Sequence, residues 1–149
     1  MYEILIVGGG PAGLTAAIYA ARAGKHVAVL ERGSTGGQII SAPLVENYPG
    51  IPSVSGTELA RQMTEQACTF GAEIVYTEAV GLEKTPAGFR VLCTDGVREA
   101  KTVILATGAA HRRLDLPWET TLTGCGVSYC AVCDGAFYEG LDVAVVGGG

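Results

Sequence analysis

The sequence predicts an α/β fold, with a parallel sheet that carries an antiparallel insertion and, near the end of the chain, the start of a second domain. Three observations lead to this fold class. Short apolar runs flank an alanine-rich helical stretch close to the N-terminus. Later apolar runs are separated by an Asp-Gly dipeptide, a frequent hairpin turn. The opening pattern, an apolar run followed by three glycines, returns at residues 142–149.

The first four elements form a βαβ unit. We expect a buried strand, a glycine turn, a helix closed by Gly24 and a second apolar strand, over residues 2–7, 8–10, 11–23 and 26–30. Two strands joined by a helix within about 30 residues are parallel. This unit therefore determines the parallel part of the sheet.

The middle of the chain combines a long loop, a helix and the antiparallel insertion. Residues 33–55 are rich in Gly, Pro and Ser, and a loop of this length inside a domain is usually functional. A helix over 57–70 would place four apolar side chains on one face, those of Leu59, Met63, Ala67 and Phe70. Three strands are expected, over residues 73–82, 89–94 and 99–106, with a turn at Asp95-Gly96.

The regular pattern of apolar residues ends after Gly108. Residues 111–126 show no clear periodicity, and we place a domain boundary near Leu116. The first domain would span residues 1–115, and residues 116–149 would begin a second one. Another buried strand is expected over residues 142–146.

Composition and charge exclude several classes of protein. The net charge of −5 and the absence of a basic run argue against nucleic-acid binding, which needs clustered Lys and Arg. No apolar stretch reaches the roughly 20 residues of a membrane helix. The N-terminus lacks the basic region of a signal peptide, so we expect a cytoplasmic protein. Five cysteines, an odd number, argue against a structural disulfide framework.

Gly8, Gly10 and Gly13 form a GxGxxG pattern between the first strand and the helix. The first permits a tight turn, the second lets the backbone approach a pyrophosphate, and the third lets helix and strand pack closely. Glu31 ends the second strand, where a carboxylate binds ribose hydroxyls and disfavours a 2′-phosphate; the neighbouring Arg32 weakens this exclusion. The pattern predicts a Rossmann-like dinucleotide site and does not distinguish FAD from NAD.

Cys130 and Cys133 form a CxxC pair, whose thiols lie close enough for a redox-active disulfide. Asp134 follows directly and is a candidate proton donor or acceptor. Three alternatives remain open: an iron–sulfur loop, since Cys125 adds the plant-type spacing; a zinc site, for which only His111 is at hand; and inert thiols. No fourth cysteine follows, and we expect no metal.

The other three cysteines have simpler interpretations. Cys68 and Cys93 lie in apolar-patterned elements, and we expect both in the core. Cys125 is expected to be a bystander, although its nearness to the CxxC pair would allow disulfide reshuffling.

Several motifs together resemble the low-molecular-weight thioredoxin reductases, within the pyridine nucleotide-disulfide oxidoreductase family. In chain order they are VGGGPAGLTAAIYAARAG, GGQI, ENYPG, ATGA and GVSYCAVCDGAFY. The resemblance covers essentially all 149 residues. It implies a Rossmann-like FAD-binding domain followed by the start of an NAD(P)H-binding domain that carries the CxxC pair.

The resemblance also implies a role for each matching residue. Cys133 would face the flavin, Cys130 would attack the protein substrate, and Asp134 would carry the proton. The residues that would line the FAD site, in addition to Gly8, Glu31 and Arg32, are Gly10, Pro11, Ala12, Gly13, Gly37, Gln38, Asn47, Ala79, Thr107 and Gly108.

The implied reaction runs from NADPH to FAD, then to the Cys130–Cys133 disulfide and finally to thioredoxin, in a homodimer. The second glycine motif begins at Gly147 and stops there, so we expect the chain to be the N-terminal portion of a longer protein and to be inactive alone. Alternatives are a related reductase with another donor or acceptor, such as the flavoprotein subunit of alkyl hydroperoxide reductase, and a flavin-binding module without turnover. The peroxide-linked relative normally has an extra N-terminal domain, so the strand that directly follows Met1 argues against it.

Overall fold

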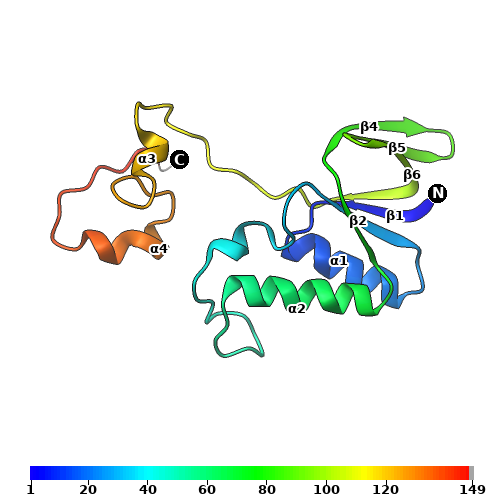
Figure 1. The fold of residues 1–149 in the computed structure, drawn as a ribbon, viewed down its shortest axis with the longest axis horizontal. Helices are drawn as coiled ribbons and strands as arrows, with labels where there is room; N and C mark the ends of the chain where they lie inside the picture. Colours follow the sequence, from blue (N-terminus) through cyan, green and yellow to red (C-terminus); the bar gives the residue numbers. More distant parts are fainter. Residues whose placement is uncertain (148–149) are drawn as a thin grey trace. The chain divides into compact units, whose positions relative to one another are not determined.

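The computed structural model describes residues 1–147, with the side chains of Val132 and Cys133 left aside. The chain divides into two compact units, one over Met1–Gly108 and one from Ala109 onwards (Figure 1). This division lies earlier in the chain than the predicted boundary near Leu116. The assignment of each unit to a functional domain stays a prediction.

A six-stranded sheet organises the first unit. Its order is β3-β2-β1-β6-β5-β4, and β3, β2, β1 and β6 run parallel while β6, β5 and β4 form an antiparallel meander. The predicted parallel sheet with an antiparallel insertion is therefore confirmed. The strands are β1 (Tyr2–Val7), β2 (Val27–Glu31), β3 (Glu73–Tyr76), β4 (Ala79–Thr85), β5 (Gly88–Cys93) and β6 (Gly96–Leu105).

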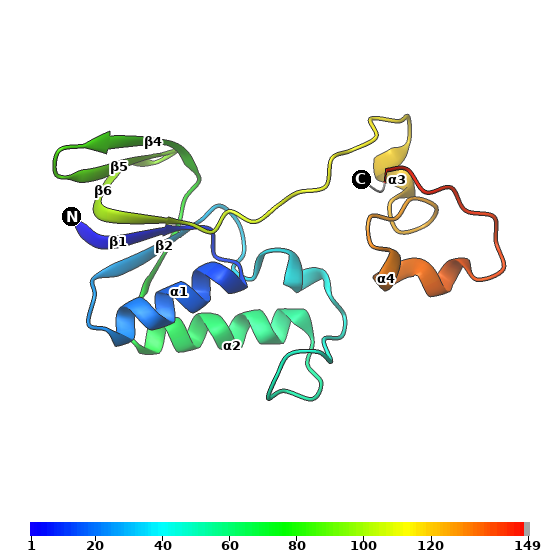
Figure 2. The same cartoon turned by 180° about the vertical axis from the view of Figure 1, so that it is seen from behind.

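The strand β6 belongs to both parts of the sheet. Its first half pairs with β5 and its second half with β1, and Ala100 pairs with both Phe89 and Tyr2. The meander consequently folds over one face of the parallel strands, while α1 (Pro11–Arg22) and α2 (Gly56–Thr69) cover the other face (Figure 2). The unit therefore has three layers.

An apolar core lies on each face of the parallel strands, between neighbouring layers. Successive side chains of a strand point to opposite faces, so neighbouring residues pack into different cores. Ile6 of β1 packs with the buried alanines of α1, whereas its neighbour Leu5 packs toward Val91 and Cys93 of the meander. All four side chains are nearly or fully buried. The prediction that Cys93 is a core residue is thus confirmed.

Local signals explain both long helices. Pro11 is the first residue of α1, where its missing N–H costs nothing, and Gly24 follows the helix with φ +70°. The helix α2 begins after Ser55, whose hydroxyl accepts a hydrogen bond from the Glu58 amide at 3.2 Å. Phe70, expected on the buried face, follows the helix and is exposed, while Arg22 lies over its ring.

The predicted strand over residues 73–82 was wrong as a single element. The chain leaves β3 at one edge of the sheet and enters β4 at the opposite edge. Thr77 makes the connection: its amide donates to the Glu31 carbonyl at 2.9 Å, and its hydroxyl donates to Asp95. An apolar run predicts strand conformation, but its pairing partners decide whether it is one strand or two.

Two smaller predictions also need correction. The hairpin turn consists of Thr94 and Asp95, since Gly96 already pairs with Cys93. Cys68 is exposed on α2, because the buried stripe of that helix runs through Leu59, Met63 and Ala67.

The expected strand over residues 142–146 is not formed. These residues are irregular and exposed, and no described strand pairs with them, so they lack the ladder that a strand requires. Of the repeated glycines, Gly148 and Gly149 lie outside the described residues.

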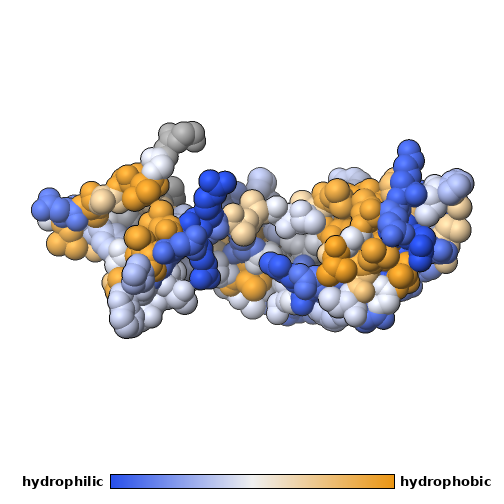
Figure 3. All heavy atoms as spheres, turned by 90° about the horizontal axis from the view of Figure 1, so that it is seen from above, coloured by the Kyte–Doolittle hydropathy of each residue, from blue (hydrophilic) through white to orange (hydrophobic). Residues whose placement is uncertain are grey.

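The described part of the second unit contains three short elements, which are α3 (Glu119–Leu122), α4 (Ala131–Asp134) and the 3-10 helix η2 (Gly135–Tyr138). Apolar side chains reach its surface (Figure 3), including those of Phe137 and Val145. Among its described residues only Glu119 is buried, and its carboxylate accepts hydrogen bonds from the Leu114 and Leu116 amides at 3.3 and 3.2 Å. Local hydrogen bonds rather than an apolar core therefore shape this unit.

None of the described helices has the length and apolar character to cross a membrane.

Candidate functional site

The carboxyl end of β1 and the N-terminus of α1 meet in a tight glycine turn. Gly8 has φ +107°, and a Cβ there would lie 2.3 Å from the Ala106 carbonyl oxygen. A Cβ on Gly13 would lie 1.9 Å from the Gly8 carbonyl oxygen. Both contacts are far below van der Waals distance, so the packing of this turn requires glycine at both positions.

Gly10 differs from its two neighbours in the pattern. Its φ is −74°, which any residue adopts, and the nearest atom to a Cβ would be the Gly37 Cα at 3.9 Å. The protein itself therefore leaves space above Gly10. The next backbone amides, those of Ala12 and Gly13, belong to the first turn of α1 and have no acceptor within the helix. Open space beside free amides at a helix N-terminus suits an anionic group.

Glu31 is held directly beside the glycine turn. Its Oε2 accepts a hydrogen bond from the Gly9 amide at 2.7 Å, and its Oε1 accepts one from the Gly33 amide at 2.9 Å. The carboxylate thus links the ends of β1 and β2 and keeps lone pairs for further donors. The adjacent Arg32 is exposed, with its Nη1 3.7 Å from the Glu78 carboxylate.

The start of the long loop folds back over the turn. The Gly36 amide donates to the Gly9 carbonyl at 2.7 Å, and a Cβ on Gly37 would lie 3.3 Å from the Gly10 Cα. The 3-10 helix η1 (Gly37–Ser41), which contains Gln38, follows immediately. The structure therefore brings the predicted Gly37 and Gln38 to the glycine turn.

The remaining predicted cofactor residues lie at different distances from this turn. Thr107 is close: its Cα would be 3.2 Å from a Cβ on Gly8, and Gly108 follows it. Ala79 begins β4, two residues after the Thr77 amide that bonds to Glu31. Asn47 is exposed within the loop, between the bridged residues Val45 and Val54.

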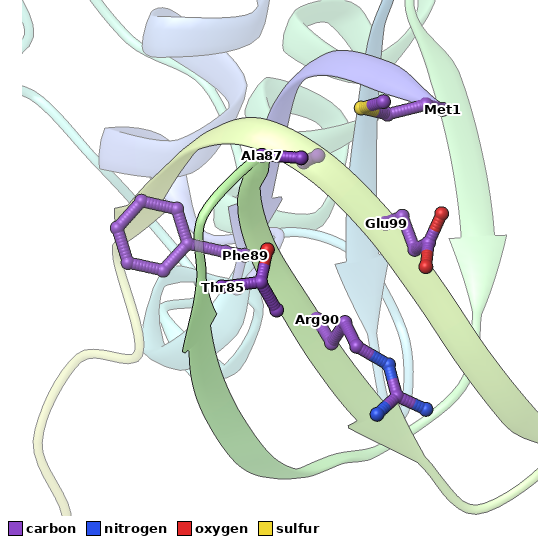
Figure 4. A pocket seen from close by; sticks show the side chains of 7 residues that line it. Met1, Thr85, Ala87, Phe89, Arg90 and Glu99 are labelled. Atoms are coloured by element: carbon purple, nitrogen blue, oxygen red, sulfur yellow. The ribbon is translucent and has the colours of Figure 1, made fainter.

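The described surface also contains a small pocket on the meander, at the amino end of β1 (Figure 4). The glycine turn follows the opposite, carboxyl end of that strand, so the pocket is separate from it. The side chains that line the pocket include those of Met1, Thr85, Ala87, Phe89, Arg90 and Glu99.

The second candidate site surrounds Cys130, which is disulfide-bonded. The helix α4 begins directly after it, and the Asp134 amide donates to the Cys130 carbonyl at 3.0 Å. This helical turn brings Asp134 back to the cysteine. The side chain of Cys133 lies outside the described residues, so its predicted role stays a prediction.

Ser128 belongs to this site, and the sequence-based interpretation missed it. Its hydroxyl donates to the Asp134 Oδ2 at 2.6 Å and accepts from the Cys130 amide at 3.1 Å. The available signal was a serine two positions before the cysteine, since Ser side chains often bond to the amide two residues on.

The remaining cysteines carry free thiols. Cys93 is buried, whereas Cys68 and Cys125 are exposed, and the Cys125 thiol lies 3.4 Å from the Thr121 carbonyl. Within the described part of the chain, no group of three or more His, Cys, Asp or Glu side chains is arranged to hold a metal ion.

Comparison with known proteins places this arrangement in a family. The family described as pyridine nucleotide-disulphide oxidoreductase matches residues 2–149. This chain belongs to that family. Its sequence is 46% identical over 149 residues to a thioredoxin reductase of Treponema pallidum, covering 99% of this chain and 48% of the relative. It is 44% identical to the thioredoxin reductase of Bacillus subtilis, covering 100% of this chain and 47% of that protein.

Solved structures agree with the sequence comparison. The thioredoxin reductase of Streptococcus pyogenes superimposes with a TM-score of 0.80 at 50% identity, over 93% of this chain and 45% of that one. The chain therefore has the Rossmann-like fold found in thioredoxin reductases. It spans about half the length of the curated relatives it matches.

Proposed function

We propose that this chain is the FAD-binding and disulfide-carrying part of a flavoprotein disulfide reductase, which passes electrons from NADPH through FAD and the Cys130–Cys133 disulfide to thioredoxin or a thioredoxin-like protein. One combination of features supports the proposal. The glycine turn, called the cradle below, consists of Gly8, Gly10 and Gly13 with open space beside Glu31, and it occurs in the same chain as a disulfide-bonded Cys130 next to Asp134. The similarity to thioredoxin reductases supports this reading.

The residues of the cradle fit the anionic part of FAD. Gly10 leaves free space where a backbone must approach a pyrophosphate, and the first turn of α1 has no acidic side chain that would repel it. Glu31 is held at the end of β2, where a carboxylate binds ribose hydroxyls. Bound FAD would supply two-electron transfer between a nicotinamide nucleotide and the disulfide.

Each cradle residue then has a defined task. Pro11 and Ala12 begin the helix whose amides bind the pyrophosphate with Gly10 and Gly13, and Arg32 flanks the ribose site. On the flavin side, the loop and the end of the first unit would contribute Gly37, Gln38, Asn47, Thr107 and Gly108, and Ala79 would offer its backbone to the adenine.

The disulfide segment would perform thiol exchange. After reduction, the Cys130 thiolate attacks one sulfur of the thioredoxin disulfide, and the other sulfur leaves as a thiolate. The Cys133 thiolate then attacks Cys130 in this mixed disulfide, which restores the Cys130–Cys133 bond and releases reduced thioredoxin. Asp134 would take a proton from a thiol of the pair as its thiolate forms and deliver a proton to the departing thiolate.

A flavin spectrum and an electron-transfer assay test this function. The purified full-length protein should show flavin absorbance, bleach on addition of NADPH and reduce thioredoxin with turnover. Cys130→Ser should retain the flavin and lose thioredoxin reduction. Failure to bind FAD, even when FAD is added, would contradict the proposal, and bleaching only with another reductant would show a different electron donor.

We also propose a homodimer, supported by family resemblance alone. Sedimentation of the full-length protein should give twice the monomer mass at micromolar concentration. A monomer under these conditions would contradict this proposal without affecting the reaction.

A further inference from the structure

The Ser128 hydroxyl makes three contacts within the disulfide segment. It lies 2.6 Å from the Asp134 Oδ2, 3.1 Å from the Cys130 amide nitrogen and 3.3 Å from the Cys130 carbonyl oxygen. A hydroxyl has one proton to donate and two lone pairs to accept with. It therefore satisfies at most one of the two oxygens as a donor at any moment.

The protonation of Asp134 decides which oxygen receives this proton. An ionised carboxylate only accepts, so Ser128 donates to it and accepts from the Cys130 amide; hydrogen bonds to a charged acceptor are the stronger ones. A protonated Asp134 donates to Ser128, whose own proton then turns to the Cys130 carbonyl. The same heavy-atom geometry serves both states, because only hydrogen atoms change place.

In the described part of the chain, no charged side chain pairs with the Asp134 carboxylate in competition with the Ser128 hydroxyl. The basic residues of the second unit are His111, Arg112 and Arg113, and none forms an ion pair with the Asp134 carboxylate. Arg113 bonds to Thr120, and His111 stacks on Tyr129. In α4, η2 and the preceding residue, the other groups that can titrate are Tyr138 and, once the disulfide is reduced, the two cysteines of the pair.

We propose that Ser128 is a positioning residue of the disulfide site, which holds the Asp134 carboxyl against the Cys130 backbone in both protonation states. This role rests on the proposed function, in which the proton of a thiol moves to the ionised Asp134 and leaves a thiolate and a neutral carboxyl. Ser128 stays bonded before and after this transfer, so the carboxyl does not need to move when the proton does.

The test is a titration of the Asp134 carboxyl in the full-length protein, by ¹³C NMR with labelled aspartate. Asp134→Asn identifies the resonance. Ser128→Ala removes a strong bond to the ionised carboxylate and a weaker one to the neutral acid. The midpoint should therefore move to higher pH, because the bond that is lost stabilises the ionised carboxylate more than the neutral acid. Ser128→Thr keeps the hydroxyl and should restore the original midpoint.

Thr120→Ala is the matched control, since Thr120 accepts a hydrogen bond from Arg113 in the same unit and does not contact Asp134. It should leave the midpoint unchanged. An unchanged midpoint in Ser128→Ala, or an equal shift in Thr120→Ala, would overturn the proposal. If Ser128→Ala fails to fold, Ser128→Thr still tests it, because loss of the wild-type midpoint in this hydroxyl-bearing variant would count against the role.

A kinetic measurement connects this role to turnover. The pH profile of kcat/KM for thioredoxin should shift in the same direction in Ser128→Ala, and Ser128→Ala should have no further effect in an Asp134→Asn background. A full additional effect in that background would refute action through Asp134. The NMR titration needs neither flavin nor thioredoxin, so failure of the proposed reaction and failure of the Ser128 role give different results.

Discussion

Two glycines of the same motif should respond in opposite ways to the same substitution. In Gly13→Ala the new Cβ would lie 1.9 Å from the Gly8 carbonyl oxygen, about 1.5 Å closer than the 3.4 Å at which ordinary contact begins. The obstacle is backbone, so α1 must move away from β1. In Gly10→Ala the nearest atom would be 3.9 Å away, and φ is −74°, so the protein accommodates the methyl group.

The expected magnitudes follow from these distances. Overpacking against backbone in a buried turn costs about 1–3 kcal/mol, and the size of the overlap places Gly13→Ala at the upper end. Gly10→Ala should be neutral or stabilising by up to about 1 kcal/mol, because alanine has less freedom in the unfolded chain. The same methyl group should occupy the space that a pyrophosphate needs, so FAD affinity should fall by about tenfold or more.

Urea unfolding followed by circular dichroism measures the stabilities, and titration with FAD measures the affinities. The result that would refute the reasoning is a Gly10→Ala protein that is destabilised as much as Gly13→Ala, or one that binds FAD as tightly as the wild type. The first outcome would mean that the protein leaves no room for a methyl group at Gly10, and the second would mean that the space above Gly10 is not the ligand site.

Three further predictions concern other parts of the chain. Glu31→Arg should weaken FAD binding about ten- to hundredfold through loss of charge-assisted hydrogen bonds, while Glu31→Gln should lose less; equal binding in all three proteins would contradict the ribose assignment. Cys130→Ser should show a long-wavelength absorbance band from a Cys133 thiolate beside oxidised flavin, and a band only in Cys133→Ser would reverse the assignment. The Tyr2 hydroxyl holds the pKa of Glu73 below its usual range, so this contribution to stability is present above the unfolded pKa and is lost as the pH falls through the lowered one. The difference in melting temperature between wild type and Glu73→Gln should shrink over that range, and a difference independent of pH would contradict it.

The sequence alone determined the elements whose signals are local. The run of β1, the proline and glycine that bound α1, and the spacing of Gly8, Gly10 and Gly13 predicted the βαβ unit, which the structure confirms. Local backbone conformation explains this success, because a left-handed glycine or a helix start is specified by a few neighbouring residues. The resemblance to thioredoxin reductases likewise depended on short motifs and was confirmed by the comparisons.

Only the tertiary structure decided which segments pair and which side chains meet. The run after Glu73 predicted a strand, but its division between opposite edges of the sheet depends on β2 and β5 as partners. Residues 142–146 have the composition of a strand and form none, since no described strand pairs with them. The bonds from Glu31 to the Gly9 amide and from Ser128 to Asp134 connect residues through the path of the folded backbone. Composition and spacing specify what a segment prefers, whereas its hydrogen-bond partners are supplied by other parts of the chain, and these are known only once the chain is folded.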